Sequence, residues 1–286
     1  MPVTEPQDER DRATVLVTGA TGKTGRRVAR LLAGRGLAVR AVSRSTAPRF
    51  DWYDGAGWEP VLRGVTAAYL VVPDLGSPRL PPVVAALARR AAAAGVGRAV
   101  LLSTGGGSPW EEGVLAAERA LAGAGLAWTV LRPRWFHQNF SEDFLRGPVM
   151  AGEVRLSTGE GREAFIDADD IAEVAVAALT EDGHAGRRYE LTGPRPLSFG
   201  EAVGEVARAS GRAIRYVPVT AKAYAGLLRG RGMDPESVAL LVGLFERVSS
   251  GALASVTGDV ERVLGRAPRD FTAYARAAAA AGAWRT

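Results

Sequence analysis

Three evenly spaced glycines, Gly19, Gly22 and Gly25, point most directly to chemistry. They form a G-x-x-G-x-x-G pattern within VLVTGATGKTG, between a strand-like run and a helix-like run. Glycine there permits a tight bend, a close backbone approach to a pyrophosphate and close helix packing. The N–H groups at the start of the helix favour the phosphate charge. The pattern predicts a dinucleotide site, with a purely structural turn as the alternative, and the expected cofactor-binding residues are Gly19, Ala20, Thr21, Gly22, Lys23, Thr24 and Gly25.

The end of the second expected strand indicates which dinucleotide is bound. NAD sites usually place Asp or Glu there, because a carboxylate accepts hydrogen bonds from the ribose hydroxyls. Here the strand ends in AVSRS, with Arg44 where a 2′-phosphate would be met. Lys23 and Arg26 oppose the dipole of the first helix, and an anionic ligand would offset that cost. We expect NADPH (NADP+) rather than NADH, with a solvated Arg44 as the alternative.

Other cofactor residues are predicted from their position alone. Ligands of open α/β sheets bind outside the carboxyl ends of the strands. Trp52 is expected beside the adenine, although a packing role explains this aromatic side chain equally well. The residues expected to line the cofactor cleft after two later strands are Val72, Pro73, Ser103 and Thr104.

The Tyr-x-x-x-Lys pair that donates a proton in short-chain dehydrogenases is missing. None of the six tyrosines has Lys four residues later, and Lys23 and Lys222 are the only lysines. If Glu118 is aligned with the acidic residue usual in that helix, Trp110 and Val114 occupy the Tyr and Lys positions. Neither side chain can donate a proton, so carbonyl reduction by that route is not expected.

Strand-like and helix-like runs alternate around these residues, which predicts βαβ units and a parallel sheet. Up to Pro133, we expect strands at 13–19, 37–44, 49–52, 67–73, 98–103 and 126–133, and helices at 23–33, 58–62, 81–94 and 110–122. Later strands are expected at 154–156, 164–166 and 188–191, and later helices at 198–209, 221–229, 234–249, 259–264 and 271–281. Asp169 or Asp170 is expected to cap a further helix that ends near Leu179.

The predicted fold class is α/β, a doubly wound parallel Rossmann sheet with a smaller, mostly helical C-terminal substrate-binding part. We expect a flexible N-terminus over 1–12, an NADP-binding Rossmann core over 13–135, and a substrate-binding cap over 136–286. Some segments of the cap are expected to return to the sheet.

The composition excludes several classes of protein. Hydrophobic residues make up 47% of the chain and charged residues 23%, which is typical of a folded globular protein. Cysteine is absent and His137 and His184 are the only histidines, so disulfides are excluded and no metal site is expected. We find no run of 18 apolar residues and no signal-peptide pattern, so we expect a cytoplasmic protein without membrane contact.

The net charge of +5 does not indicate nucleic-acid binding. Apart from Lys23 and Lys222, the 36 basic residues are arginines, and they are scattered among acidic residues rather than clustered. We expect a small-molecule substrate as the partner, and a monomer or homodimer.

Four stretches carry a resemblance to a known family: TGATGKTG, LRPRWFHQNF, STGEGREAFIDADDIAEVA and LTGPRPLSFGEAVGEVARASGR. Together they resemble the NmrA-like atypical short-chain dehydrogenases, and within that group the ergot-alkaloid-type reductases, similar to festuclavine and agroclavine dehydrogenases. The resemblance extends from about Ala13 to Trp284. It implies an NADPH-dependent reductase in which the stretch after the sixth expected strand passes the nicotinamide, namely Pro133, Arg134, Trp135 and Phe136, followed by Gln138 and Asn139.

The aromatic residues after Pro133 could form a wall that suits a flat or cationic substrate. Core packing is the alternative for each of them. The residues expected in the substrate pocket are Trp110, Trp135, Phe136, Gln138, Asn139, Phe140, Phe165 and Tyr224. His137 is the only catalytic candidate, with a hydrogen-bonded structural histidine as the alternative.

The missing tyrosine fits one chemistry well. Hydride addition to an iminium carbon cancels a positive charge, so that step needs no general acid, only orientation and a dry pocket. We expect a reductase that delivers hydride to an activated C=N or C=C bond of a small molecule, in secondary metabolism. Two alternatives stay open: an NADP-sensing regulatory protein without turnover, and a redox-neutral cyclase or epimerase on the same fold.

Overall fold

The computed structural model describes residues 13–74, 77–105 and 111–285. The chain divides into two compact units, and each is described by itself. The sheet unit comprises the described residues of 1–103, 112–131 and 172–188. The cap unit comprises the described residues of 104–111, 132–171 and 189–286. Residues 172–188 therefore belong with the sheet, although they follow a long part of the cap unit in the sequence.

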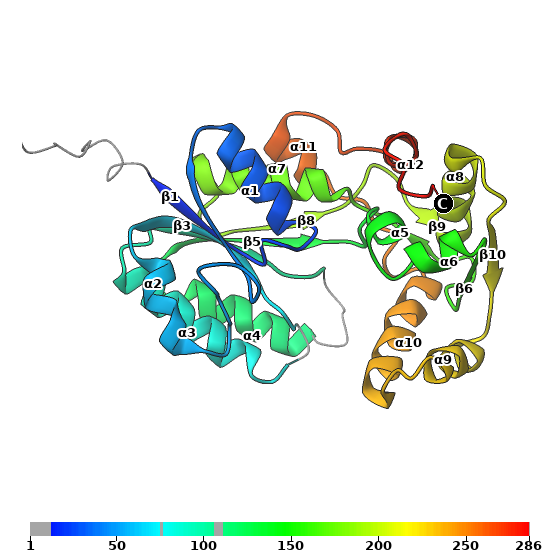
Figure 1. The fold of residues 1–286 in the computed structure, drawn as a ribbon, viewed down its shortest axis with the longest axis horizontal. Helices are drawn as coiled ribbons and strands as arrows, with labels where there is room; N and C mark the ends of the chain where they lie inside the picture. Colours follow the sequence, from blue (N-terminus) through cyan, green and yellow to red (C-terminus); the bar gives the residue numbers. More distant parts are fainter. Residues whose placement is uncertain (1–12, 75–76, 106–110, 286) are drawn as a thin grey trace, which may run out of the picture. The chain divides into compact units, whose positions relative to one another are not determined.

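A six-stranded sheet organises the sheet unit (Figure 1). Its strands lie in the order β2-β1-β3-β4-β5-β8. Their bounds are Thr14–Thr18 for β1, Ala38–Val42 for β2, Val65–Val71 for β3, Arg98–Leu102 for β4, Ala127–Pro133 for β5 and Arg187–Leu191 for β8. The pairs from β2 to β5 are parallel, and the strand order changes direction beside β1. This topology confirms the predicted doubly wound Rossmann-like sheet.

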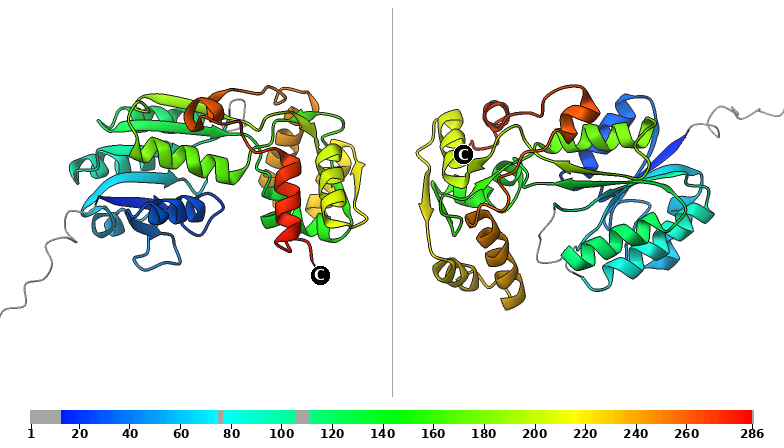
Figure 2. Two further views of the ribbon diagram at one scale, coloured as in Figure 1. Left: turned by 90° about the horizontal axis from the view of Figure 1, so that it is seen from above. Right: turned by 180° about the vertical axis from the view of Figure 1, so that it is seen from behind.

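Helices cover both faces of this sheet. Figure 1 shows α1 (Gly25–Gly34) and α7 (Ala168–Thr180) on one face, and α2 (Trp58–Leu62), α3 (Leu80–Ala93) and α4 (Glu111–Ala122) on the other. Figure 2 shows α3 and α4 side by side from behind. Central strands covered on both faces read as continuous apolar runs, and Val15, Leu16 and Val17 are accordingly buried in β1.

The strand predicted over 49–52 is wrong. Arg49 makes only an isolated bridge to Ser43, while Phe50 and Trp52 insert into the core with 3% and 5% of their surface exposed. A backbone donor of this segment is hydrogen-bonded within the segment rather than to a neighbouring strand, because the Tyr53 N–H donates to the Asp51 carboxylate at 2.9 Å. A short 3₁₀ turn, Gly55–Gly57, then leads into α2.

Two small sheets and a set of helices form the cap unit. β6 (Glu153–Leu156) pairs in parallel with β10 (Arg215–Pro218), and β7 (Arg162–Glu163) pairs antiparallel with β9 (Leu197–Ser198). The helices are α5 (Asn139–Glu142), α6 (Arg146–Met150), α8 (Phe199–Ser210), α9 (Ala221–Gly230), α10 (Pro235–Ser249), α11 (Asp259–Leu264) and α12 (Phe271–Ala280). The five helices predicted after residue 198 are confirmed within a residue or two at each end.

Three details of the cap unit differ from the prediction. Strands β9 and β10 were not expected, and the strand predicted over 164–166 is replaced by β7. Ile166 makes only an isolated bridge to Phe136. Asp167 is the carboxylate that accepts a backbone N–H of α7, that of Asp169 at 2.8 Å. The buried Asp170 instead accepts from the Arg266 side chain and from the Arg269 backbone N–H, each at 2.7 Å.

An aromatic core holds the cap unit together. Phe140, Phe199, Phe245 and Phe271 are at most 2% exposed and contact one another edge-on or tilted. Such ring pairs stabilise a core beyond the burial of apolar area alone. None of the helices within the described ranges combines the length and the apolar composition needed to cross a bilayer.

Candidate functional site

The glycine turn joins β1 to α1, and its glycines meet three different backbone demands. Gly19 has a φ of +61°, and a Cβ on it would lie 2.9 Å from the Cβ of Val71. The Gly22 N–H donates to the Gly19 carbonyl oxygen at 2.9 Å. A Cβ on Gly25 would lie only 2.2 Å from the same oxygen. Only glycine lets α1 start this close to the strand that precedes it.

The start of α1 offers backbone donors without a competing side chain. Thr24, at the N-cap, makes no side-chain capping hydrogen bond, and the first turn contains no acidic residue. Thr21, Gly22 and Arg26 are exposed, so an anion can approach the turn from solvent. Helix N-terminal N–H groups and the helix dipole both favour a bound phosphate. The residues present therefore fit the pyrophosphate of a dinucleotide.

A hydrogen bond holds the end of β3 beside this turn. The Val71 N–H donates to the Thr18 hydroxyl oxygen at 2.8 Å, and Thr18 lies at the end of β1. Val72, half-buried, and Pro73, exposed, follow directly after β3. The structure thus brings the end of β3 to the same sheet edge as Gly19, as the sequence predicted from strand order.

Arg44 lies at the same edge of the sheet. Thr18 and Val42 are paired residues of β1 and β2, and the Ala20 N–H donates to the Val42 carbonyl oxygen at 3.2 Å. Arg44 follows β2 two residues later and is exposed. Within the described part of the chain, its guanidinium has no hydrogen-bond or ion-pair partner. A phosphate that reached this edge could therefore pair with it without breaking an existing contact.

Trp52 is a packing residue in the structure. Its indole N–H donates to the Val71 carbonyl oxygen at 2.9 Å, and its ring lies edge-on to Phe50 at 5.6 Å. With 5% of its surface exposed, Trp52 offers little area to an adenine. The burial favours the packing alternative, and contact with adenine stays a prediction.

Ser103 and Thr104 follow β4, and Ser103 makes a buried contact. The Ser103 hydroxyl donates to the Glu118 carboxylate at 2.7 Å, and Arg188 binds the other oxygen at 3.3 Å. Glu118 is 1% exposed. This arrangement fixes the rotamer of Ser103 at the carboxyl end of its strand, while Trp110 lies outside the described residues.

In the cap unit, the segment after Pro133 places Trp135 among other rings. Trp135 stacks on Phe245 with centroids 5.2 Å apart and meets Phe144 edge-on at 5.8 Å. Trp135 and Phe136 are half-buried, and Pro133 is buried. Phe140 and Phe165, at 0% and 2% exposure, lie in the aromatic core, so their burial favours packing over contact with substrate.

Gln138, Asn139 and His137 are buried in the same segment. The Gln138 amide donates to Asp167 at 2.9 Å and accepts from the Ala168 N–H at 2.9 Å, which uses both ends of the amide at the start of α7. Asn139 begins α5, and its backbone N–H donates to the Phe136 carbonyl oxygen at 3.1 Å. The side-chain contacts of Gln138 indicate a structural role, and contact with substrate stays a prediction for both amides.

His137 makes interior contacts on both ring nitrogens. Its Nε2 lies 3.0 Å from the Phe165 carbonyl oxygen, so that nitrogen is the donor, and Nδ1 lies 3.5 Å from the Asp167 carboxylate. Burial raises the pKa of Asp167, but His137 and nearby N–H donors outweigh this effect and lower the pKa to about 2. His137 has no exposed surface, which favours the structural alternative over a proton donor in contact with substrate.

Sequence analysis did not single out Glu163. Its side chain has no exposed surface, and among the described residues no donor meets its carboxylate oxygens in good hydrogen-bond geometry, although the backbone N–H groups of Ala164 and Trp135 are close enough to lower its pKa. Burial raises the pKa of Glu163 to about 8, while the nearby Arg134 charge acts in the opposite direction. The Nε of Arg134 is likewise buried without a partner in the described chain. A single acidic residue directly before the strand expected at 164–166 gave no signal of this burial.

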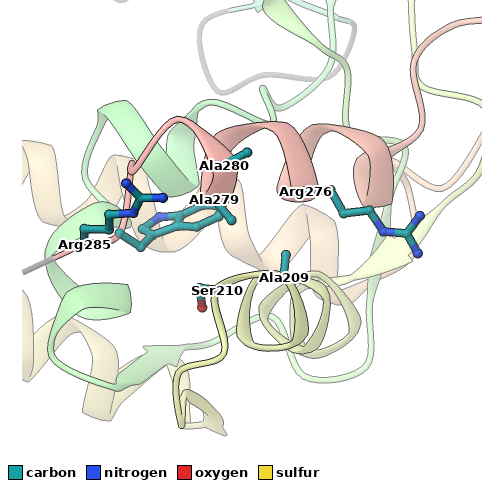
Figure 3. Close-up of a pocket in the computed structure, with 7 residues that line it drawn as sticks. Ala209, Ser210, Arg276, Ala279, Ala280 and Arg285 are labelled. Atoms are coloured by element: carbon teal, nitrogen blue, oxygen red, sulfur yellow. The ribbon is translucent and has the colours of Figure 1, made fainter.

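Three cavities are lined by described residues of the cap unit, one of about 500 Å³ along α8 and two others. The larger of these two, about 740 Å³, lies among α6, β6, α9 and α10, and Tyr224 lines it. Figure 3 shows the smaller, about 410 Å³, between α8 and α12, with Arg276 and Arg285 on its rim. Of the predicted pocket residues that the structure describes, only Tyr224 lines either cavity. Across the described residues, no three His, Asp or Glu side chains gather as a metal site would require.

Comparison with known proteins identifies the family. Residues 19–182 match the NAD(P)H-binding family model. An NAD(P)H azoreductase of Xenophilus azovorans is 36% identical over 93% of this chain and 98% of its own length. Agroclavine dehydrogenase of Claviceps fusiformis is 32% identical over 91% of this chain and 96% of its own length.

A solved structure supports the fold. The crystal structure of NmrA, a negative transcriptional regulator in complex with NAD, superposes with a TM-score of 0.70 at 17% identity, over 93% of this chain and 94% of that one. At this identity the likeness concerns the fold alone. Together with the family match and the two relatives, it confirms the resemblance found in the sequence. The chain belongs to the NAD(P)H-binding family and is an NAD(P)H-dependent oxidoreductase with an NmrA-like fold.

Proposed function

We propose that this protein is an NADPH-dependent reductase that delivers hydride to an activated C=N or C=C bond of a small molecule of secondary metabolism. The glycine turn carries the proposal, because Gly25 leaves no room for a side chain against Gly19 and the helix start is free of acidic residues. The 32% identity to an agroclavine dehydrogenase supports a reductase of the ergot-alkaloid type.

NADPH is proposed over NADH because of the charge at the end of β2. Arg44 is exposed there, and the turn Ser43–Thr46 contains no carboxylate to accept hydrogen bonds from ribose hydroxyls. An arginine pairs well with a phosphate through two parallel N–H donors. Gly19, Gly22 and Gly25 would hold the pyrophosphate, and Arg44 would hold the 2′-phosphate.

The chain's own residues would bind and orient rather than exchange protons with the substrate. The reduced nicotinamide, when bound, supplies the hydride. Pro133, Trp135 and Phe136 would keep water from that ring with apolar surface. The Tyr-Lys pair is absent and His137 is fully buried, so an acceptor that needs no proton in the hydride step suits these residues best.

The test is turnover with labelled coenzyme. Purified protein is mixed with NADPH and a panel of cyclic iminium ions and conjugated enals, and the loss of reduced-nicotinamide absorbance is followed. With NADPH deuterated at the transferable position, the product should gain one deuterium on the former C=N or C=C carbon. Heat-denatured protein serves as the control for uncatalysed reduction.

Two outcomes would contradict the proposal. Tight binding of NADPH with no turnover across the whole panel would favour a coenzyme-sensing protein. Product formed with no net loss of NADPH and no deuterium transfer would favour a redox-neutral cyclase or epimerase.

A further inference from the structure

The larger cavity of the cap unit combines apolar walls with two polar groups on one helix. Its volume of about 740 Å³ is in the range of small-molecule sites. Apolar side chains make up much of the lining, among them Leu145, Leu156, Leu228 and Leu241. Phe144, at 39% exposure, is one of two large hydrophobic side chains that are exposed among the described residues, and it also lines this cavity.

Helix α9 presents the polar groups. Tyr224 lies in α9 and Arg231 directly follows its last residue, Gly230, so the two are seven residues, or two helical turns, apart on the same side of the helix. Leu227 and Leu228 lie between them, and all four line the cavity. The Arg231 charge is near enough to Tyr224 to act on its hydroxyl group.

The hydroxyl group of Tyr224 can donate a hydrogen bond to a molecule in this cavity. The side chain is 6% exposed, and its ring meets Phe245 edge-on at 5.2 Å. Among the described residues, its hydroxyl has no hydrogen-bond partner. Burial raises the pKa of Tyr224 to about 12, although the Arg231 charge acts in the opposite direction. The phenol therefore stays protonated at neutral pH and can donate a hydrogen bond.

The side chains that line the cavity carry one more positive charge than negative charge. Glu153 and Arg155 also line the cavity, but they pair with each other, and Arg215 binds the same carboxylate at 2.7 Å. Arg231 is exposed and has no ion-pair partner in the described part of the chain. Burying an apolar molecule against the leucines would thus bring any anionic group it carries close to Arg231.

We propose that this cavity binds an apolar molecule bearing a carboxylate, with Arg231 pairing with the anion and Tyr224 donating a hydrogen bond to it. Trp135 contacts Phe144 at the cavity wall and Phe245 behind Tyr224, so the segment expected to pass the nicotinamide packs against the residues that form this cavity. Resting on the proposed function, the inference names the substrate class: acceptors whose carboxylate lies away from the double bond that is reduced.

Binding is measured first, without coenzyme. Isothermal titration compares 2-naphthoate with its neutral isostere 2-naphthamide. We expect naphthoate to bind at least tenfold more tightly. Arg231→Gln should remove that preference, and Tyr224→Phe should reduce it several-fold while the ring stays packed on Phe245. Equal affinities for the two probes, no measurable binding of naphthoate, or an unchanged naphthoate affinity in Arg231→Gln would each overturn the inference.

Two arginines provide matched controls. Arg229→Gln removes an exposed cation from the same helix outside the cavity lining, and Arg276→Gln removes one from the smaller cavity of Figure 3. Both should bind naphthoate as the unmodified protein does. A loss of binding in Arg276→Gln with none in Arg231→Gln would move the site to the α8–α12 cavity and overturn the inference. Thermal denaturation of every variant checks that the fold is kept.

Turnover separates this inference from the proposed function. Acceptors that carry a carboxylate should show a KM at least tenfold lower than their amides, with a similar kcat, because the contact is remote from the reacting bond. Reduction of both acceptor forms with equal KM would overturn the carboxylate site and leave the reductase standing. Selective naphthoate binding without reduction of any acceptor would contradict the reductase and leave the site standing.

Discussion

The glycine turn and the buried acidic residue Glu163 place opposite demands on side chains. At the turn, side chains are removed so that backbone groups can approach a ligand, and a Cβ on Gly25 would overlap the Gly19 oxygen at 2.2 Å. In the cap unit, an acidic side chain is enclosed with no exposed surface, and its burial outweighs the effect of the backbone N–H groups beside it. The glycine turn requires residues without a side chain. The stability of the region around Glu163 depends on whether its carboxyl group is protonated.

This difference predicts what a substitution in each region should change. Overpacking a turn deforms the backbone at every pH, because the cost is steric. A buried carboxylic acid costs little when it is neutral and far more when it is ionised. Substitution at the turn should therefore remove coenzyme binding, while substitution of Glu163 should change how stability depends on pH.

The largest effect is expected from Gly25→Ala. The added methyl would require α1 to move away from the Gly19 carbonyl oxygen, which displaces the N–H groups expected to bind pyrophosphate. We expect affinity for NADPH to fall at least 100-fold, about 2.7 kcal/mol. Isothermal titration measures the affinity, and thermal denaturation shows whether the variant stays folded.

Gly34→Ala is the matched control on the same helix. Gly34 ends α1, and a Cβ there would meet nothing within 4 Å. This variant should bind NADPH normally and be as stable as the unmodified protein or slightly more so, because alanine lowers the entropy of the unfolded chain. If both variants bound NADPH equally well, the glycine turn would not be the coenzyme site.

Glu163→Gln should have an intermediate effect, visible in the pH dependence of stability. The pKa of Glu163 is about 8 in the folded protein against 4.5 for the unperturbed side chain, so the folded state holds a proton that the unfolded state loses. This contribution to stability is complete below pH 4.5 and is lost as the pH rises toward 8. Glutamine mimics the neutral acid, so the variant should lose less stability between pH 5 and 8, by on the order of a few kcal/mol.

Urea denaturation at several pH values measures this slope. Glu59→Gln changes an 84% exposed carboxylate that pairs with Arg63, and it should leave the pH dependence as it is. If Glu163→Gln and the unmodified protein lost stability in parallel across this range, Glu163 would be ionised in the folded state. The contrast with the glycine turn would then be wrong.

The sheet unit could be predicted largely because its signals are local. Apolar runs, the glycines that end helices and the expected strand order are enough to predict that the turn, Arg44, Val72 and Ser103 lie at one edge of the sheet. Phe50 and Trp52 are an exception, since an apolar segment bounded by turns reads the same whether it pairs as a strand or inserts as side chains into a core.

The cap unit was less predictable because its contacts join distant segments. Tyr224 was predicted in the pocket for its ring alone, and nothing in the sequence indicated that Arg231 and Leu156 would line one cavity with it. Phe140 and Phe165 look like pocket aromatics in the sequence, but they pack against each other and against Phe199 of α8 and Phe271 of α12. Burial of this kind depends on tertiary packing that spacing does not encode.

The smallest expected effect tests coenzyme choice at the sheet edge. Arg44→Asp replaces a cation that would face the 2′-phosphate with an anion that would repel it, and Asp can accept hydrogen bonds from ribose hydroxyls. Affinity for NADPH should fall about tenfold, or about 1.4 kcal/mol, while affinity for NADH should stay equal or rise. The NADPH effect should shrink at high salt, since Arg44 is exposed and its charge is screened. Arg49→Asp, another exposed arginine of the same loop, is the control. An equal loss of affinity for both coenzymes would show that Arg44 acts on the fold of the loop rather than on the phosphate.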